Sequence, residues 1–247
     1  FTTIKISFAK HEWSEALRFC KGAKEKGYKV FIQPMDAMGY SKEEREKMIS
    51  EINGIMPEAF VIVGTFGTMH LSDLQEVFHQ INEGLDKRIK IALHTHNNLG
   101  IANALVEELI NLCVDADRDV VVDGSLLGMA RGAGNASTEA IVAYVNERFG
   151  GKYDLGVLIE TIEKYIVPVK KQREWGYDIP MLICGIEGAH VDNIEHLKST
   201  TNLKFSDMYH VLAMMSPEQR KRYGSNYSKT DFSQLDKIIM DYKEGKI

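Results

Sequence analysis

The chain has 247 residues, of which 44% are hydrophobic, and a formal net charge of −5. This is enough apolar sequence for one large domain or for a domain with an appendage. No block of Lys or Arg indicates a nucleic-acid or anionic-membrane surface, and no apolar run approaches the roughly 18 residues of a membrane span. The composition therefore predicts a globular protein that binds neither nucleic acid nor membrane.

The three cysteines, Cys20, Cys113 and Cys184, are far apart in the sequence and form no C-x-x-C pair. Such spacing is typical of buried thiols in a reducing compartment. No signal peptide is visible, but the sequence begins with Phe1 rather than Met, so targeting can be judged only in part. On this basis we expect a cytoplasmic protein.

Short apolar runs rich in β-formers begin at five places, about 25 to 31 residues apart. They start near Thr3, Tyr28, Ala59, Ile89 and Asp119. Segments with helical periodicity follow them, at residues 11–26, 41–52, 72–85, 101–114 and 137–149. Near-continuous apolar strands that alternate with amphipathic helices are typical of parallel βα units.

A period near 30 residues is that of the (β/α)8 TIM barrel, in which eight units take about 250 residues. Five strands cannot close such a barrel, and a doubly wound open sheet is the structural alternative. We favour an α/β fold in which residues 1–150 form the last five βα units of a TIM barrel. The first three units, about 90 residues by the same arithmetic, would lie upstream of Phe1 or come from another chain.

The strand pattern stops after Gly150 and Gly151. The periodicity then predicts a long amphipathic helix at 153–175 and shorter helices at 191–197, 206–214, 217–223 and 231–242. Residues 151–247 are therefore predicted to be an α-helical C-terminal extension. Its apolar faces could pack on the barrel, on a second subunit or on a partner. We expect a homodimer, because twofold dimers are the commonest oligomers.

His94 and His96 stand at the end of the apolar run 89–96 and are followed by Asn-Asn-Leu-Gly. Residues two apart on a strand point to the same face, with Cβ atoms roughly 6–7 Å apart. That separation lets two imidazoles converge on one divalent cation. The simpler interpretation is two polar strand-end side chains bonded to water or backbone; we favour the cation.

Other candidates follow from position, because the active site of a parallel barrel lies at the carboxyl ends of its strands. Gln33, Thr65 and Asp123 end three of the predicted strands, and the glycine-rich loop 128–134 leads to Asn135 at the same rim. The simpler interpretation is that Thr65 and Asp123 bond only to backbone and that the loop is a tight connection or an anion nest.

Two imidazoles with amide and carboxylate oxygens suit Mn²⁺ or Mg²⁺, with Zn²⁺ or Co²⁺ as alternatives. A cation in such a site polarises a carbonyl and steadies an enolate. Cleavage or formation of a carbon–carbon bond next to a ketone is therefore the reaction class that these residues favour.

Three motifs then coincide in order and spacing. VGTFGTM at 63–69 resembles a strand-6 A-D-T-x-G motif, and HTHNNLG at 94–100 resembles a strand-7 H-x-H-N-D/N-x-G motif. The segment 128–139 resembles a strand-8 G-x-G-x-x-A-G-N-x-x-x-E loop. Over about residues 1–150 the chain thus resembles the HMG-CoA-lyase-like, or pyruvate-carboxyltransferase-like, metal-dependent TIM barrels, and most of all their 4-hydroxy-2-oxovalerate aldolase branch.

The resemblance implies a divalent-metal-dependent aldolase, a carbon–carbon lyase that cleaves a 2-oxo acid such as a 4-hydroxy-2-oxo acid through an enolate. It implies that His94 and His96 are metal ligands, that Asn135 is at the metal or one water away, and that Thr65 lies near the substrate as a catalytic residue. We further assign three residues to substrate binding: Gln33, Asn98 and Asp123.

The sequence also departs from this family in three places. No D-R-E-like motif supplies the family's third ligand and its arginine, so enzyme activity is expected only if an upstream segment provides them. Gly64 replaces the strand-6 aspartate, and Gly185–His190 matches the aldolase branch's G-Y-A-G-x-Y segment with Ile186 and His190 at the tyrosine positions. These changes predict a substrate other than 4-hydroxy-2-oxovalerate.

His190 is accordingly a candidate catalytic residue, although it could also be a surface residue at a helix N-terminus. Two other functions stay open at this point. One is a Claisen-type acyltransferase of the isopropylmalate synthase kind, and the other is a barrel-derived binding module without turnover. A dehydrogenase partner is likewise an open alternative.

Overall fold

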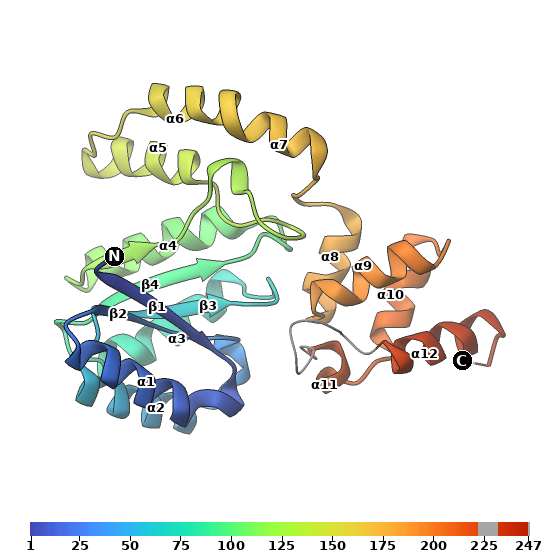
Figure 1. Ribbon diagram of the computed structural model, residues 1–247, viewed down its shortest axis with the longest axis horizontal. Coiled ribbons are helices and arrows are strands. Elements are labelled where there is room, and N and C mark those ends of the chain that lie inside the picture. The colour runs from blue at the N-terminus through green and yellow to red at the C-terminus, as the bar shows by residue number, and fades with distance from the viewer. Residues whose placement is uncertain (222–231, 247) are drawn as a thin grey trace.

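The computed structural model describes residues 1–221 and 232–246 and shows a parallel sheet, helices around it and a helical extension (Figure 1). The strands are β1 (Thr3–Phe8), β2 (Lys29–Pro34), β3 (Ala59–Gly64), β4 (Lys90–Thr95) and β5 (Val120–Val122). All pairs are parallel, in the order β1-β2-β3-β4-β5. This sequential order is that of a barrel, whereas a doubly wound sheet reverses its strand order. The expected partial TIM barrel is confirmed.

A helix follows each strand: α1 (Trp13–Glu25), α2 (Lys42–Ile55), α3 (Leu71–Gly84), α4 (Ala102–Asp115) and α5 (Thr138–Phe149). The start of α2 shows how the sequence sets these boundaries. Ser41 Oγ accepts from the Glu44 N–H, and the Glu44 carboxylate accepts from the Ser41 N–H. This reciprocal capping box satisfies two backbone donors that the helix itself leaves unpaired.

The two faces of the sheet differ in what they bury. On the outer face, Ile62, Ile91 and Leu93 pack with the helices in the main core. On the inner face, a small cluster of Ala59, Val61, Val63 and Ala92 is joined by Phe31 and Val121. Alternate residues of each strand thus serve opposite faces, and the inner face corresponds to the inside of the barrel.

The sheet is strongly curved. In a flat sheet, four strand intervals of about 4.8 Å would put β1 and β5 roughly 19 Å apart. Lys5 on β1 nevertheless reaches Asp123, just after β5, with Nζ 2.6 Å from Oδ1. The first and last strands therefore turn toward each other across a concave inner face.

After α5 the chain forms α6 (Leu155–Thr161), a π-helical segment (Ile162–Ile166) and α7 (Val167–Gln172). The single helix predicted at 153–175 is therefore shorter than expected and is interrupted by the π segment. Pro168 gives the reason, because it has no N–H for the regular helical bond and its ring crowds the preceding turn.

The extension continues as α8 (Ile179–Glu187), α9 (Val191–Thr200), α10 (Phe205–Ala213), α11 (Pro217–Arg220) and α12 (Ser233–Lys243). The periodicity of the sequence did not predict α8. The helices predicted at 217–223 and 231–242 include positions 222, 223 and 231, which lie outside the described residues. These helices enclose a hydrophobic core of their own, which includes Cys184, Ile194, Leu197, Val211 and Leu235.

Helices α8 to α12 of the extension lie beyond the carboxyl ends of the strands, where the arrowheads of β3 and β4 point toward them, whereas α6 runs alongside α5 (Figure 1). The hydrogen bonds that join the chain from Trp175 onward to loops of the barrel include three with a backbone carbonyl as the acceptor. Asn98 Nδ2 donates to the Met181 carbonyl (3.0 Å), Trp175 Nε1 to the Leu127 carbonyl (2.9 Å) and the Gly176 N–H to the Gly132 carbonyl (3.0 Å). The extension therefore covers part of the rim at which the predicted site residues stand.

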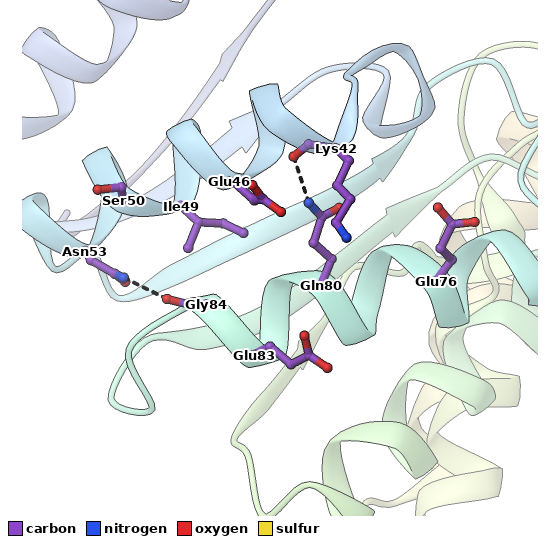
Figure 2. Close-up of a pocket in the computed structure, with 9 residues that line it drawn as sticks. All are labelled: Lys42, Glu46, Ile49, Ser50, Asn53, Glu76, Gln80, Glu83 and Gly84. Atoms are coloured by element: carbon purple, nitrogen blue, oxygen red, sulfur yellow. Dashed lines mark hydrogen bonds between the residues drawn. The ribbon is translucent and has the colours of Figure 1, made fainter.

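A surface groove lies elsewhere, between α2 and α3 on the outside of the barrel (Figure 2). Its lining includes Glu46, Glu76 and Glu83, and the hydrogen bond from Asn53 Nδ2 to the Gly84 carbonyl closes one end. None of the predicted site residues lines this groove, so it takes no part in the candidate site. Among the described residues, no helix combines the length and apolarity needed to cross a membrane.

Candidate functional site

His94 and His96 lie on the inner face at the carboxyl end of β4. Ala92 belongs to the inner cluster, and residues two and four positions later on the strand share its face. The two imidazole centroids are 5.2 Å apart, with an interplanar angle of 83°. The rings are thus on one side of the sheet, at its concave rim.

Each imidazole is held through Nδ1. His96 Nδ1 is 2.7 Å from the Thr65 carbonyl, and His94 Nδ1 is 3.1 Å from Asp123 Oδ2. A carbonyl and a carboxylate only accept hydrogen bonds, so in each neutral ring the proton is assigned to Nδ1. This tautomer leaves the lone pair on Nε2, which is the atom a metal ligand needs.

The charge state of His96 agrees with this assignment. Burial lowers the pKa of His96 below its ordinary value, and the neighbouring His94 and His190 lower it further. For Asp123, burial alone would raise the pKa, but the hydrogen bonds with His94 and Lys5 outweigh burial and lower it. Near neutral pH the site therefore pairs a neutral His96 with an ionised Asp123.

Asn135 comes to the histidines through the glycine-rich loop. It forms an antiparallel bridge with His96, and the Asn97 N–H donates to the Gly134 carbonyl at 2.9 Å. Gly128 and Gly134 have positive φ angles, 61° and 80°, which side chains other than glycine rarely adopt. Residues that face each other in an antiparallel bridge have their side chains on the same face, so this backbone puts Asn135 on the same face as His96.

The Asn135 amide oxygen is buried and has no hydrogen-bond partner among the residues that the structure describes. A buried acceptor without a partner is costly, and a bound cation would satisfy it. Two imidazole nitrogens and an amide oxygen form the mixed N/O donor set that suits Mn²⁺ or Mg²⁺ with positions open to substrate. No group of three His, Cys, Asp or Glu side chains within 1–221 and 232–246 forms a metal cluster, so the amide is needed for a third ligand. The residues present fit such a cation.

Gln33 and Thr65 stand near this point on neighbouring strands. Gln33 is 9% exposed, and its Oε1 is buried with no partner in the described part of the chain. Thr65 Oγ1 accepts from the Asp36 N–H at 2.7 Å. This is the bond to backbone that the simpler interpretation of Thr65 predicted. The Thr65 carbonyl orients His96. Their predicted roles with substrate stay predictions.

His190 and Asn98 lie where the extension meets the rim. His190 is the N-cap of α9, its Nδ1 accepts from the Asp192 N–H at 3.2 Å, and burial lowers its pKa. It is close enough to His96 to affect the pKa of that ring. Asn98 is buried and donates to the Met181 carbonyl. Its predicted contact with substrate, like the catalytic role of His190, stays a prediction.

Three charged residues at this rim were missed by the sequence analysis. Lys5 pairs with Asp123, and Lys221 lies 2.8 Å from Asp36 Oδ2. Arg131 contacts Asp192 and Glu195 of α9. Only Lys5 could have been found from the sequence. Polar residues alternate with apolar ones along β1, which indicates that one face of this strand lies outside the apolar core.

The fold and this rim define an α/β-barrel protein with a candidate metal site at the carboxyl ends of its strands. The sequence profile of the HMGL-like family matches residues 2–163, well over half of the chain. The chain belongs to the HMGL-like family.

Individual relatives give the same picture. The chain is 24% identical to the oxaloacetate decarboxylase of Mycobacterium tuberculosis over 85% of its own length and 60% of that protein. It is 30% identical to 4-hydroxy-2-oxovalerate aldolase 4 of Rhodococcus opacus over 68% of its own length and 46% of that protein. The chain thus spans about half the length of the curated relatives it matches.

Solved structures agree on the fold. The carboxyl transferase domain of Rhizobium etli pyruvate carboxylase superposes with a TM-score of 0.64 at 18% identity, covering 98% of this chain and 42% of that chain. The HMG-CoA lyase of Bacillus subtilis gives a TM-score of 0.57 at 18% identity, covering 71% and 65% of the two chains. At these identities the likeness establishes the fold alone.

Proposed function

We propose that this chain carries the metal-binding half of the active site of a carbon–carbon lyase that acts on 2-oxo acids. One observation supports this above all: at a single strand-end rim, two imidazoles accept or donate a hydrogen bond through Nδ1, and the buried amide oxygen of Asn135, the residue bridged to His96, has no partner among the described residues. A divalent cation held there by His94, His96 and Asn135 would supply Lewis-acid polarisation of a substrate carbonyl.

The protein's own residues prepare this chemistry. Thr65 and Asp123 hold the two rings so that Nε2 of each faces the ligand position. The Gln33 side chain is proposed to bind the oxo acid, because its buried Oε1 lacks a partner among the described residues. His190 is the proposed proton carrier, since burial lowers its pKa and a neutral imidazole can take up a proton near pH 7.

The names of the relatives indicate the substrate class. Oxaloacetate and 4-hydroxy-2-oxovalerate are both 2-oxo acids, and breaking the bond between C3 and C4 leaves the same three-carbon enolate from each. We therefore propose release of pyruvate from a 2-oxo acid, by decarboxylation or by retro-aldol cleavage. Assays for carbon dioxide and for an aldehyde product distinguish the two reactions.

The decisive experiment measures Mn²⁺ binding to the purified protein by calorimetry. The double variant His94→Ala, His96→Ala should lose at least roughly 100-fold in affinity, because two of the proposed ligands are gone. The matched control is His79→Ala with His210→Ala, which removes two exposed histidines of α3 and α10. Equal Mn²⁺ binding by the two double variants would contradict the proposed function.

A further inference from the structure

Asp123 links two side chains from different strands at the proposed metal site. Its carboxylate oxygens lie 2.6 Å and 2.5 Å from Lys5 Nζ, and Oδ2 also lies 3.1 Å from His94 Nδ1. Lys5 comes from β1, His94 from β4, and Asp123 follows β5. The three groups thus form a Lys–Asp–His chain across the concave face.

This arrangement favours a positioning role for Asp123 over direct substrate binding. Both of its oxygens already accept hydrogen bonds from cationic or ring N–H donors. Oδ2 already accepts from both Lys5 and His94, so a ligand that used this oxygen would have to displace Lys5 or release His94. The carboxylate is therefore better suited to holding the ring than to meeting a substrate.

The competing explanation is that the Lys5–Asp123 ion pair only stabilises the fold. The Lys5 and Asp123 side chains are 35% and 24% exposed, and partly exposed ion pairs contribute little to stability. An ion pair that only stabilises the fold does not explain why Asp123 also forms a hydrogen bond with His94. Carboxylates that accept from the second nitrogen of a metal-bound imidazole commonly fix its tautomer and orientation.

We propose that Asp123 and Lys5 are positioning residues for His94: Asp123 fixes the ring with Nε2 toward the cation, and Lys5 holds Asp123 in place. This inference rests on the proposed function and deepens it, because it assigns the cation affinity to a network wider than the ligands. It also gives Asp123 a role different from the substrate contact predicted from the sequence.

Electrostatics makes the two positions interdependent. In the native protein the Asp123 carboxylate neutralises the Lys5 ammonium beside the site. If Asp123 is made neutral, that ammonium stays behind and repels a divalent cation. Removing Lys5 should therefore help cation binding more when Asp123 is absent than when it is present.

The first test is a double-mutant cycle on Mn²⁺ affinity. Asp123→Asn should weaken binding by roughly 10- to 100-fold, the usual loss for such an outer partner. Adding Lys5→Met should recover part of that loss. The factor by which Lys5→Met raises Mn²⁺ affinity should be at least about threefold larger in the Asp123→Asn protein than in the wild-type protein. The double variant carries no unpaired lysine. If the single Asp123 variant fails to fold, Mn²⁺ affinity without the carboxylate can therefore be measured on the double variant.

Lys10→Met is the matched control. Lys10 pairs with Glu44 at 2.7 Å and lies 5.4 Å from the Tyr40 ring centroid, as Lys5 lies 5.6 Å from that of Phe31. Its pair is outside the concave face, so this variant should bind Mn²⁺ within about twofold of the wild type.

The second readout is the ¹⁵N spectrum of the imidazole rings in the metal-free protein at fixed pH. Asp123→Asn should move the His94 ring signals away from the Nδ1–H tautomer, whereas Lys10→Met should not. If the ion pair only stabilises the fold, Asp123→Asn would leave these signals in place. If the wild type binds Mn²⁺ and the Asp123 variants bind it equally well, positioning is refuted while the proposed function stands. A wild type without Mn²⁺ affinity would instead refute the proposed function, and this inference with it.

Discussion

The barrel part and the helical extension are built on different principles. In the barrel part, repeated βα units bury a continuous core, and every strand delivers its last side chains to the same rim. In the extension, helices α8 to α12 enclose a second core, which also takes in Ala133 from a barrel loop, and polar contacts such as Asn98 with Met181 and Lys221 with Asp36 join the extension to that rim. The comparison indicates that the repeat creates the site, while the extension closes over it.

The largest effect that would sharpen this comparison is expected at Arg118, at the foot of the barrel part. Arg118 is 6% exposed and donates to the carbonyls of Asn82, Leu85, Asp86 and Ile89 and to Asn82 Oδ1. Arg118→Met leaves several buried acceptors unpaired and should lower the free energy of unfolding by at least about 3 kcal/mol.

Urea unfolding followed by circular dichroism measures this change. Arg88→Met is the control, because Arg88 has a 76% exposed side chain and pairs with Asp86 at 2.7 Å; it should cost less than about 1 kcal/mol. A similar small loss for both variants would show that Arg118 does not hold the barrel loops together.

The contrast between the two parts also explains what the sequence could predict. Apolar strands at a regular spacing indicated the barrel units, and the alternation along β4 put His94 and His96 on one face, as the structure shows. The helix α8 was missed because its sequence Ile-Pro-Met-Leu-Ile-Cys is apolar on every side. Its buried face carries Met181, Ile183 and Cys184, but Ile179 and Ile186 on the other face are exposed. The helix therefore lacks the polar stripe that periodicity arguments require.

Contacts that depend on curvature were beyond the sequence altogether. Lys5 and Asp123 are separated by 118 positions, and they meet only because the sheet bends until β1 faces β5. The backbone bond of Thr65 Oγ1 to the Asp36 N–H likewise depends on how two loops settle against each other. Motif spacing identified which residues gather at the rim but could not identify their partners.

A medium effect is expected where the extension packs on the rim, at Gly185 in α8. A Cβ there would lie 2.9 Å from Asn98 Cβ and 3.0 Å from Leu99 Cδ2, which forces the helix away from the rim. Gly185→Ala should therefore lower stability by about 1 to 2 kcal/mol despite the better helix propensity of alanine.

Gly22→Ala in α1 is the control for Gly185→Ala, because a Cβ at Gly22 would meet nothing within 4 Å. That change should raise stability by about 0.5 to 1 kcal/mol, the ordinary gain from replacing glycine inside a helix. Thermal unfolding of the two variants gives shifts of opposite sign if the extension is packed tightly on the rim. Shifts of the same sign would show that the two parts touch only loosely.

The smallest effect is expected at Lys221, whose ammonium lies 2.8 Å from Asp36 Oδ2. The two side chains are 40% and 22% exposed, so the pair should contribute less than about 1 kcal/mol. A change of this size is best measured locally, through the labelling of buried thiols. Cys113 in the barrel part and Cys184 in the extension are both 0% exposed, and burial raises the pKa of each to about 12.

Because the two thiols match in burial and pKa, a difference in their labelling rates reports how often each region opens. Lys221→Met should speed labelling of Cys184 by less than roughly fivefold, the factor that 1 kcal/mol allows, and leave Cys113 unchanged. Lys198→Met, which removes a 3.6 Å contact with Asp178 inside the extension, is the control for losing a lysine there. Equal acceleration at both thiols would mean that the barrel part and the extension open as one unit, which would overturn the distinction drawn between them.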